Sequence, residues 1–207
     1  AADGLREVTR VPPAPVPAGV QADLRPYQKT GFDWLVFLWR HRLGGILADD
    51  MGLGKTLQLL TFVQHTKDAG ETRPFLVLAP TSVLSTWRSE AARFTPGLRV
   101  SIVDSTSGKR ADVLRAAARS SDLVVSSYTV ARLDEEEFRE VEWAGLILDE
   151  AQFVKNPKTR LHRAISTFRA DVTYAVTGTP MENSLSELWS LLKLAAPGLF
   201  PSARKFK

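Results

Sequence analysis

The chain has 207 residues, of which 44% are hydrophobic and 24% are charged, a balance typical of a soluble globular protein. It contains no cysteine, which excludes disulfides and thiolate metal sites, and no apolar run approaches the roughly 20 residues needed to cross a bilayer. The net charge of +4 permits a polyanionic partner without requiring one. We therefore expect an intracellular, cytoplasmic protein that makes no membrane contact.

The first 22 residues differ from the rest of the chain. Four prolines between positions 12 and 17 favour an extended, non-helical backbone. Periodic hydrophobic sequence starts at Asp23. We therefore divide the chain into a proline-rich lead segment, residues 1–22, which reads as a linker, and one domain, residues 23–207.

From residue 23 onward, helical and strand patterns alternate. Helices are predicted at 25–42, 55–67, 83–94, 109–119, 160–168 and 185–195, and the acidic stretch 135–140 is interpreted as a solvated helix face or a loop. Short apolar runs predict buried strands at 45–48, 75–79, 98–103, 123–126, 146–148 and 172–176. This alternation indicates an α/β fold with a mostly parallel sheet covered on both faces. In such sheets, ligands bind at the carboxyl ends of the strands.

The glycine-rich run Gly52-Leu53-Gly54-Lys55-Thr56 follows a predicted strand and opens a helix, which is the context of a phosphate-binding loop. Glycines let the backbone curl around phosphate, and the N–H groups of the helix N-terminus attract the negative charge. We expect Lys55 to reach the β- and γ-phosphates of ATP and the Thr56 hydroxyl to bind Mg²⁺. The strict pattern has glycine where this chain has Asp49, so a glycine-rich turn before an ordinary helix is the alternative.

An acidic pair, Asp149 and Glu150, directly follows the predicted strand 146–148. Asp149 suits the orientation of Mg²⁺, and Glu150 suits the positioning and activation of the attacking water. A solvated acidic turn is the alternative interpretation. Two phosphate-chemistry motifs, each behind its own strand, are more specific than either motif alone.

These motifs together resemble those of superfamily-two helicases. In the SWI/SNF-type branch, the glycine-rich loop typically reads D-E-M-G-L-G-K-T. Asp49 therefore departs from the strict phosphate-loop pattern but matches the pattern of this branch. The resemblance covers about residues 23–207. The matching segments are Leu24 to Gln28 for the adenine-recognition motif, Asp49 to Thr56 for the loop, Asp149 to Gln152 for the DExx box, Thr177 to Asn183 for motif III, and the SWI/SNF-type runs 185–192 and 197–200.

The resemblance implies a RecA-like P-loop NTPase fold, a three-layer sandwich with a mostly parallel central sheet, that uses ATP and Mg²⁺ to translocate on double-stranded DNA. Gln152 stands where many eukaryotic members have histidine, and in this it resembles bacterial and archaeal members. A bacterial protein of this kind would be associated with the nucleoid. The implied cofactor contacts are Gln28 (to adenine), Asp50, Met51, Gly52, Leu53, Gly54, Lys55 and Thr56. The implied coupling residues are Gln152, Thr177 and Thr179.

The family contacts DNA through segments that here are 79–82 and 126–128. Hydroxyls and backbone N–H groups suit phosphate contacts that carry no sequence information. Each hydroxyl could instead cap a helix, and Thr81 or Ser82 is a plausible cap of the helix 83–94. Lys155, a further candidate after the DExx box, could instead lie in a solvated loop. The DNA-contact candidates are Thr81, Ser82, Ser127 and Lys155.

Members of this family bind ATP between two RecA-like lobes, and the second lobe carries an arginine finger. The chain ends shortly after motif III, so we expect it to hold only the first lobe. Its partners would be the second lobe of the same polypeptide, double-stranded DNA and the protein–DNA complex that is remodelled.

Three functions are compatible with these motifs: a translocase that remodels protein–DNA complexes, a strand-separating helicase, and a nucleotide-gated binding module. A binding module has no need of Glu150, which argues against the third. The five tryptophans are interpreted mainly as packing residues, with base stacking as the alternative.

Overall fold

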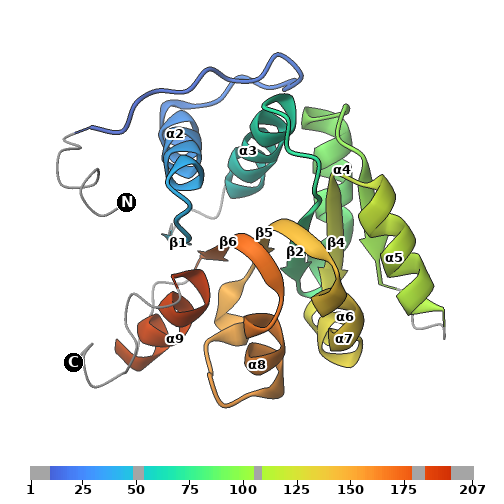
Figure 1. Ribbon diagram of the computed structural model, residues 1–207. Coiled ribbons are helices and arrows are strands. Elements are labelled where there is room, and N and C mark those ends of the chain that lie inside the picture. Colours follow the sequence, from blue (N-terminus) through green and yellow to red (C-terminus); the bar gives the residue numbers. More distant parts are fainter. Residues whose placement is uncertain (1–9, 49–53, 105–108, 179–184, 197–207) are drawn as a thin grey trace.

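The computed structural model describes residues 10–48, 54–104, 109–178 and 185–196, and these ranges confirm the expected three-layer α/β architecture (Figure 1). Six strands form one sheet with the order β1-β6-β5-β2-β4-β3, and every neighbouring pair is parallel. All the carboxyl ends therefore lie at one edge of the sheet. The strands are β1 (Gly45–Ala48), β2 (Phe75–Ala79), β3 (Val100–Val103), β4 (Leu123–Ser127), β5 (Glu142–Leu148) and β6 (Arg169–Thr177).

Helices cover both faces of the sheet (Figure 1). One face carries α2 (Pro26–Arg40), α3 (Lys55–Asp68) and α4 (Leu84–Phe94). The other face carries α5 (Arg110–Ser120), α6 (Tyr128–Leu133), α7 (Glu135–Glu140), α8 (Arg160–Ser166) and α9 (Leu185–Ala195). Two short 3₁₀ helices, η1 (Thr81–Val83) and η2 (Ala151–Val154), follow β2 and β5. Within the described ranges, no helix has both the length and the apolar character needed to span a membrane.

Two hydrophobic cores, one on each face of the sheet, follow from the alternation of side chains along the strands. In β2, Phe75, Val77 and Ala79 pack toward α2–α4, whereas Leu76 and Leu78 pack toward the opposite helical layer. All the residues of β2 and β4 are buried. A parallel strand covered on both faces has no solvent-facing side, which is why these strands read as continuous apolar runs.

The structure corrects several predicted boundaries. β5 and β6 begin earlier than predicted, at Glu142 and Arg169, because the ladder pairs these two polar residues at the rim of the sheet. The short helix α6 was not predicted, since its six residues are too few to show a period. The acidic stretch 135–140 is helical, but Phe138 inside it is fully buried, so the solvated-face interpretation holds for only part of it.

The lead segment lies against the domain along residues 11–21. Ala14 is buried, and its backbone N–H donates to Asp33 Oδ1 at 2.9 Å. The backbone N–H of Gln21 donates to the carbonyl oxygen of Phe94 at 2.7 Å. These contacts tie the segment to α2 and to the end of α4. The domain division at residue 22 stays a prediction.

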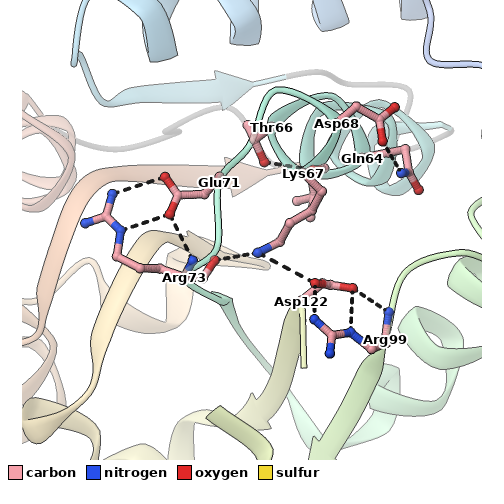
Figure 2. A network of polar contacts seen from close by, with 9 residues as sticks. Gln64, Thr66, Lys67, Asp68, Glu71, Arg73, Arg99 and Asp122 are labelled. Carbon is pink, nitrogen blue, oxygen red and sulfur yellow. Dashed lines mark hydrogen bonds and ion pairs between the residues drawn. The ribbon is translucent and has the colours of Figure 1, made fainter. Parts of the chain in front are cut away.

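A polar network joins the amino-terminal ends of the strands, at the edge opposite the motifs (Figure 2). Asp122 accepts hydrogen bonds from the backbone N–H and the guanidinium of Arg99, at 2.9 and 3.1 Å, and lies 3.7 Å from Lys67 Nζ. Burial by itself would raise the pKa of Asp122, but these hydrogen bonds and the two positive charges outweigh it and lower the pKa. At Lys67, burial prevails over the nearby carboxylates and lowers the pKa. Lys67 is also held by the Arg73 carbonyl oxygen at 2.6 Å.

Asp122→Asn is expected to lower the free energy of unfolding at neutral pH by about 3 kcal/mol, because it leaves Lys67, whose side chain is only 10% exposed, without its Asp122 carboxylate. Chemical denaturation measures this change. The pKa of Asp122 lies below its ordinary value of 3.8 in the folded chain. The stability it confers is therefore fully present above about pH 4 and is lost as the pH falls further, so the difference between the two proteins should shrink in acid.

Asp112→Asn is the matched control, because Asp112 pairs with Arg115 on the exposed face of α5 at 3.2 Å. Its effect should stay below about 0.5 kcal/mol. Equal losses in the two variants would contradict a special role of the network in Figure 2.

Candidate functional site

The motifs found in the sequence meet at the carboxyl-terminal edge of the sheet. β1, β6 and β5 are neighbours, so the carboxyl ends of these three strands lie side by side. They surround a cleft of about 170 Å³. Four residues predicted to act on ATP and Mg²⁺, Lys55, Thr56, Asp149 and Glu150, lie in its wall together with Val83, Thr86, Trp87, Val176 and Gly178.

Lys55 is the first residue of α3 and is 7% exposed. Its Nζ donates to the carbonyl oxygen of Thr177 at 2.8 Å. Thr177 ends β6, so this hydrogen bond ties the start of α3 to the end of the strand beside β1. A buried ammonium at a helix N-terminus provides an environment suited to an anionic phosphate.

Gly54, which precedes α3, meets Gln28 of α2. Gly54 has a left-handed backbone with a φ of 90°, which glycine adopts without strain. A Cβ placed on Gly54 would lie 2.1 Å from Gln28 Nε2. Gln28 Oε1 accepts a hydrogen bond from the backbone N–H of Arg25 at 2.8 Å, which fixes the side chain at the start of α2. The predicted adenine-recognition residue therefore lies directly against the end of the phosphate loop.

A larger cleft of about 610 Å³ opens between α2, α3 and β1. Its lining is mostly apolar, with two exposed aromatic side chains, and it shares Lys55 with the smaller cleft. An apolar cleft next to a phosphate-type site has the character of a nucleoside site. Its lining residues are Tyr27, Thr30, Gly31, Trp34, Ile46, Leu47, Ala48, Lys55 and Gln58.

Asp149 continues the ladder of β5, since its backbone N–H donates to the Leu78 carbonyl oxygen at 2.8 Å. Each carboxylate oxygen accepts one hydrogen bond: Oδ1 from the Glu150 backbone N–H and Oδ2 from the Trp87 indole N–H, both at 2.9 Å. Burial raises the pKa of Asp149, and the Glu150 charge adds to the rise, whereas these hydrogen bonds and the Lys55 charge oppose it. A cation in the cleft would relieve the cost of burying this carboxylate.

Glu150 has a left-handed backbone, with φ 50° and ψ 52°. For a residue with a side chain this conformation is strained, and such strain collects at functional sites. Glu150 Oε2 accepts a hydrogen bond from Gln152 Nε2 at 2.6 Å, and Gln152 Oε1 accepts one from Thr177 Oγ1 at 3.3 Å. A chain of hydrogen bonds thus joins Glu150 to two of the predicted coupling residues.

The DNA-contact candidates fall into two groups. Thr81 and Ser82 are exposed in η1, and neither side chain caps α4, so the helix-cap prediction for them is wrong: Val83 occupies the cap position. Ser127 is buried, and its hydroxyl accepts a hydrogen bond from the Val130 backbone N–H at 3.1 Å, which confirms the helix-cap alternative. Lys155 is exposed just after η2. Five predicted residues lie outside the described residues: Asp50, Met51, Gly52, Leu53 and Thr179.

Three residues at the site were not anticipated from the sequence. Trp87, interpreted as a packing residue, is buried but also donates to Asp149. Tyr128 donates its hydroxyl to the Asp149 carbonyl oxygen at 2.5 Å. Glu90 is half-buried one turn after Trp87, and burial raises its pKa, which the neighbouring Thr56 hydroxyl partly offsets. The spacing of Trp87 and Glu90 in the predicted helix 83–94 was a usable signal, because residues three apart share a helix face.

The oxygen ligands at the cleft fit a magnesium ion that arrives with a nucleotide. In the part of the chain that the structure describes, no three or more histidine or acidic side chains form a metal site by themselves. Mg²⁺ is usually held by one or two carboxylates together with substrate phosphates. Thr56 and Asp149, which flank the same cleft, provide a hydroxyl and a carboxylate for such a site.

Comparisons with known proteins agree with this geometry. The family model of the SNF2-related domain matches residues 27–207. The putative ATP-dependent helicase/translocase YwqA of Bacillus subtilis (strain 168) is 39% identical over 203 residues, which are 98% of this chain and 22% of the relative. The ISWI chromatin-remodeling complex ATPase ISW1 of Saccharomyces cerevisiae is 37% identical over 193 residues, 92% of this chain and 17% of the relative.

Among solved structures, the Sulfolobus solfataricus SWI2/SNF2 ATPase core in complex with dsDNA superimposes with a TM-score of 0.83 and 38% sequence identity. The match covers 92% of this chain and 39% of that core. The chain belongs to the SNF2-related family, and its fold is the RecA-like fold of the SWI2/SNF2 ATPase core. It spans about a fifth of the length of the two curated relatives.

Gly54→Ala is expected to destabilise the folded chain and to weaken nucleotide binding, because the added Cβ would displace Gln28 and would hold alanine in a left-handed conformation. Gly70→Ala is the control, since Gly70 also has a positive φ of 101° but has nothing within 4 Å of the added Cβ. The control should lose only the backbone term of about 1–2 kcal/mol. Thermal unfolding and nucleotide titration of both variants measure the difference, and equal behaviour would refute the close contact.

Proposed function

We propose that the protein containing this chain is a DNA-stimulated ATPase that translocates on double-stranded DNA and remodels protein–DNA complexes. Residues 23–207 are its first RecA-like lobe. The observation that carries this proposal is the convergence of Lys55, Thr56, Asp149 and Glu150 on one cleft of about 170 Å³. Membership of the SNF2-related family supports it. Such a protein acts where DNA is, which in a bacterial cell is the nucleoid within the cytoplasm.

The residues around the cleft have separate roles in ATP hydrolysis. Lys55 exchanges its hydrogen bond to the Thr177 carbonyl oxygen for the β- and γ-phosphates, so the nucleotide meets a preformed ammonium. Thr56 and Asp149 would hold Mg²⁺, which neutralises phosphate charge when it is bound. Glu150, held at its carboxylate by Gln152, positions the attacking water and accepts its proton.

The nucleoside occupies the larger cleft beside Lys55. Gln28 lies against Gly54 at the end of the phosphate loop, and its amide has the donor and acceptor needed to recognise an adenine edge. The exposed rings of Tyr27 and Trp34 provide apolar surface for the base. Asp50, Met51, Gly52 and Leu53 complete the phosphate loop in this proposal.

Coupling of hydrolysis to movement runs through the hydrogen bonds from Glu150 to Gln152 and from Gln152 to Thr177. When the γ-phosphate is lost, Glu150 changes its hydrogen-bond partner. These hydrogen bonds transmit the change to the end of β6, where the motif III sequence continues to Thr179. The responding surface is the second lobe of the same polypeptide. The chain covers 39% of the length of the Sulfolobus core, which leaves room for that lobe.

DNA contact is assigned first to Thr81 and Ser82, because their hydroxyls are exposed and are not used to cap α4. Lys155 is exposed and adds a positive charge that suits phosphate. Ser127 is the weakest of the four candidates, since its hydroxyl is buried and caps α6. The related Sulfolobus core is described in complex with dsDNA, which supports a duplex as the substrate.

The strand-separating helicase is the competing function. A strand-displacement assay beside a triplex-displacement assay separates the two outputs: a translocase removes the third strand and leaves the duplex intact. Unwinding of the duplex would favour the helicase instead. The strained Glu150 at the cleft argues against a nucleotide-gated binding module, because simple binding has no use for it.

Lys55→Ala in the intact protein is expected to abolish ATP hydrolysis and to leave DNA binding largely unchanged, because the ammonium contacts phosphate and not DNA. ATPase assays with and without double-stranded DNA, beside a DNA-binding titration, measure both properties. Lys109→Ala, at an exposed lysine before α5, is the control and should keep full activity. Unchanged hydrolysis in Lys55→Ala would refute the assignment of the phosphate loop.

The isolated 207-residue chain is expected to bind ATP weakly and to hydrolyse it very slowly. The reason is that in this proposal the second lobe supplies an arginine finger, a group worth roughly 10³–10⁵ in rate in comparable phosphoryl-transfer enzymes. Single-turnover ATPase measurements on the chain and on the intact protein test this expectation. Full DNA-stimulated turnover by the isolated chain would contradict it.

A further inference from the structure

Gln58 lies one turn after Lys55 on α3, and its side chain lines the larger cleft. Its backbone N–H donates to the Gly54 carbonyl oxygen at 3.1 Å, so the residue belongs to the first turn of the helix that begins at the phosphate loop. Residues three apart on a helix lie on one face. Lys55, which lines both clefts, and Gln58 therefore follow each other along one wall, with the ammonium nearer the phosphate-type cleft.

The amide of Gln58 is buried without a partner in the protein. The residue is only 5% exposed. Within the part of the chain that the structure describes, its side chain forms no hydrogen bond, whereas Gln64, further along the same helix, donates to Asp68 Oδ1 at 2.9 Å. An unpaired polar group in a buried position costs stability, and an apolar side chain of the same length avoids that cost. An amide kept in this position, in the wall of a cleft, therefore indicates a ligand that supplies the missing hydrogen bonds.

We propose that Gln58 is a specificity-determining residue of the nucleotide site, which selects adenine by contacting its exocyclic amino group and the adjacent ring nitrogen. The proposal rests on the ATP site described above and names a side chain that chooses the base. A glutamine amide presents an oxygen acceptor and an N–H donor side by side, which matches the donor and acceptor on one edge of adenine. Gln28 offers a first amide against Gly54, whereas Gln58 lines the cleft itself.

The rest of the cleft suits a base better than a sugar. Residues 46–48 of β1 provide an apolar wall, and the exposed rings of Tyr27 and Trp34 add aromatic surface from α2. A purine is flat, so it requires apolar surface at its faces and hydrogen-bonding groups only at its edges. A ribose carries hydroxyl groups that such walls leave unpaired. The base is therefore the part of the nucleotide that this cleft and its amide fit.

Gly31 on α2 makes the room in which the Gln58 amide lies. A Cβ added to Gly31 would lie 2.0 Å from Gln58 Oε1 and 2.7 Å from its Cδ. Glycine inside a helix is less stable than alanine, so its presence within α2 has a local cost. That cost keeps the space between the two helices open for the amide. Because the atoms that the Cβ meets are the end of a flexible side chain, alanine at this position is accommodated by moving Gln58 out of place.

The test measures the coupling between the Gln58 amide and the adenine amino group in the intact protein. Calorimetric titration gives the affinities for ADP and for purine riboside diphosphate, which is ADP without its exocyclic amino group. In the wild type, ADP should bind about tenfold more tightly than this analogue. Gln58→Met keeps the length of the side chain and removes the amide, so the ratio of the two affinities should fall about fivefold.

Two further variants separate base selection from structure. Gln64→Met is the same substitution on the same helix, at a buried residue outside the lining of the cleft, and should keep the wild-type ratio. Gly31→Ala retains Gln58 but displaces its amide, so the ratio should fall as it does in Gln58→Met. Thermal unfolding should show Gln58→Met to be at least as stable as the wild type, because the variant removes an unpaired buried amide. If Gln58→Met fails to fold, Gly31→Ala decides.

A wild-type affinity ratio in folded Gln58→Met would overturn the proposal, and so would an equal fall in Gln64→Met, which would mark a general structural effect. Equal binding of the two diphosphates by the wild type would also overturn it. Lys55→Ala checks the underlying site separately. If that variant weakens both diphosphates while Gln58→Met keeps the wild-type ratio, the ATP site stands and only the inference fails. If Lys55→Ala binds ADP as the wild type does, the proposed function fails and the inference fails with it.

Discussion

The site depends on the parallel pairing of three strands, β1, β6 and β5. Their ladders place Ala48 beside Thr177 and Leu148 beside Ala175, so the three chains leave the sheet at adjacent points. The hydrogen bond from Lys55 to the Thr177 carbonyl oxygen forms across the first of these junctions. Because side chains reach only a few ångströms, this adjacency is what brings Lys55, Asp149 and Gly178 to one cleft.

The two edges of the sheet have different physical character. At the amino-terminal edge, Asp122 is surrounded by donors and positive charge, and its pKa is lowered. At the carboxyl-terminal edge, Asp149 is partly buried with a raised pKa, and Glu150 has a strained backbone. Structural charges in a folded protein are satisfied within the chain, whereas charges at a functional site await a ligand. The two carboxylates therefore differ: hydrogen bonds and positive charge lower the pKa of Asp122, whereas burial prevails at Asp149 and raises its pKa.

α4 connects the cleft to the surface proposed for DNA. It follows η1, where Thr81 and Ser82 are exposed, and within its first two turns it reaches Asp149 through the hydrogen bond from Trp87. A rigid helix moves as a unit, so a contact at its start and this hydrogen bond are mechanically linked. In the proposed function, α4 is therefore a short physical connection between the DNA contacts and the ATP site within one lobe.

The sequence by itself determined the α/β class, the strands of the sheet and the residues that approach the phosphate site. Apolar runs such as 75–79 and 123–126 are short and unbroken, as expected of strands covered on both faces, and the motifs that contain Lys55 and Asp149 can be read from local sequence alone. The tertiary structure decided the strand order, the burial of Ser127, and the hydrogen bond from Trp87 to Asp149. These features are contacts between residues distant in the chain, and local patterns do not encode which distant residues meet.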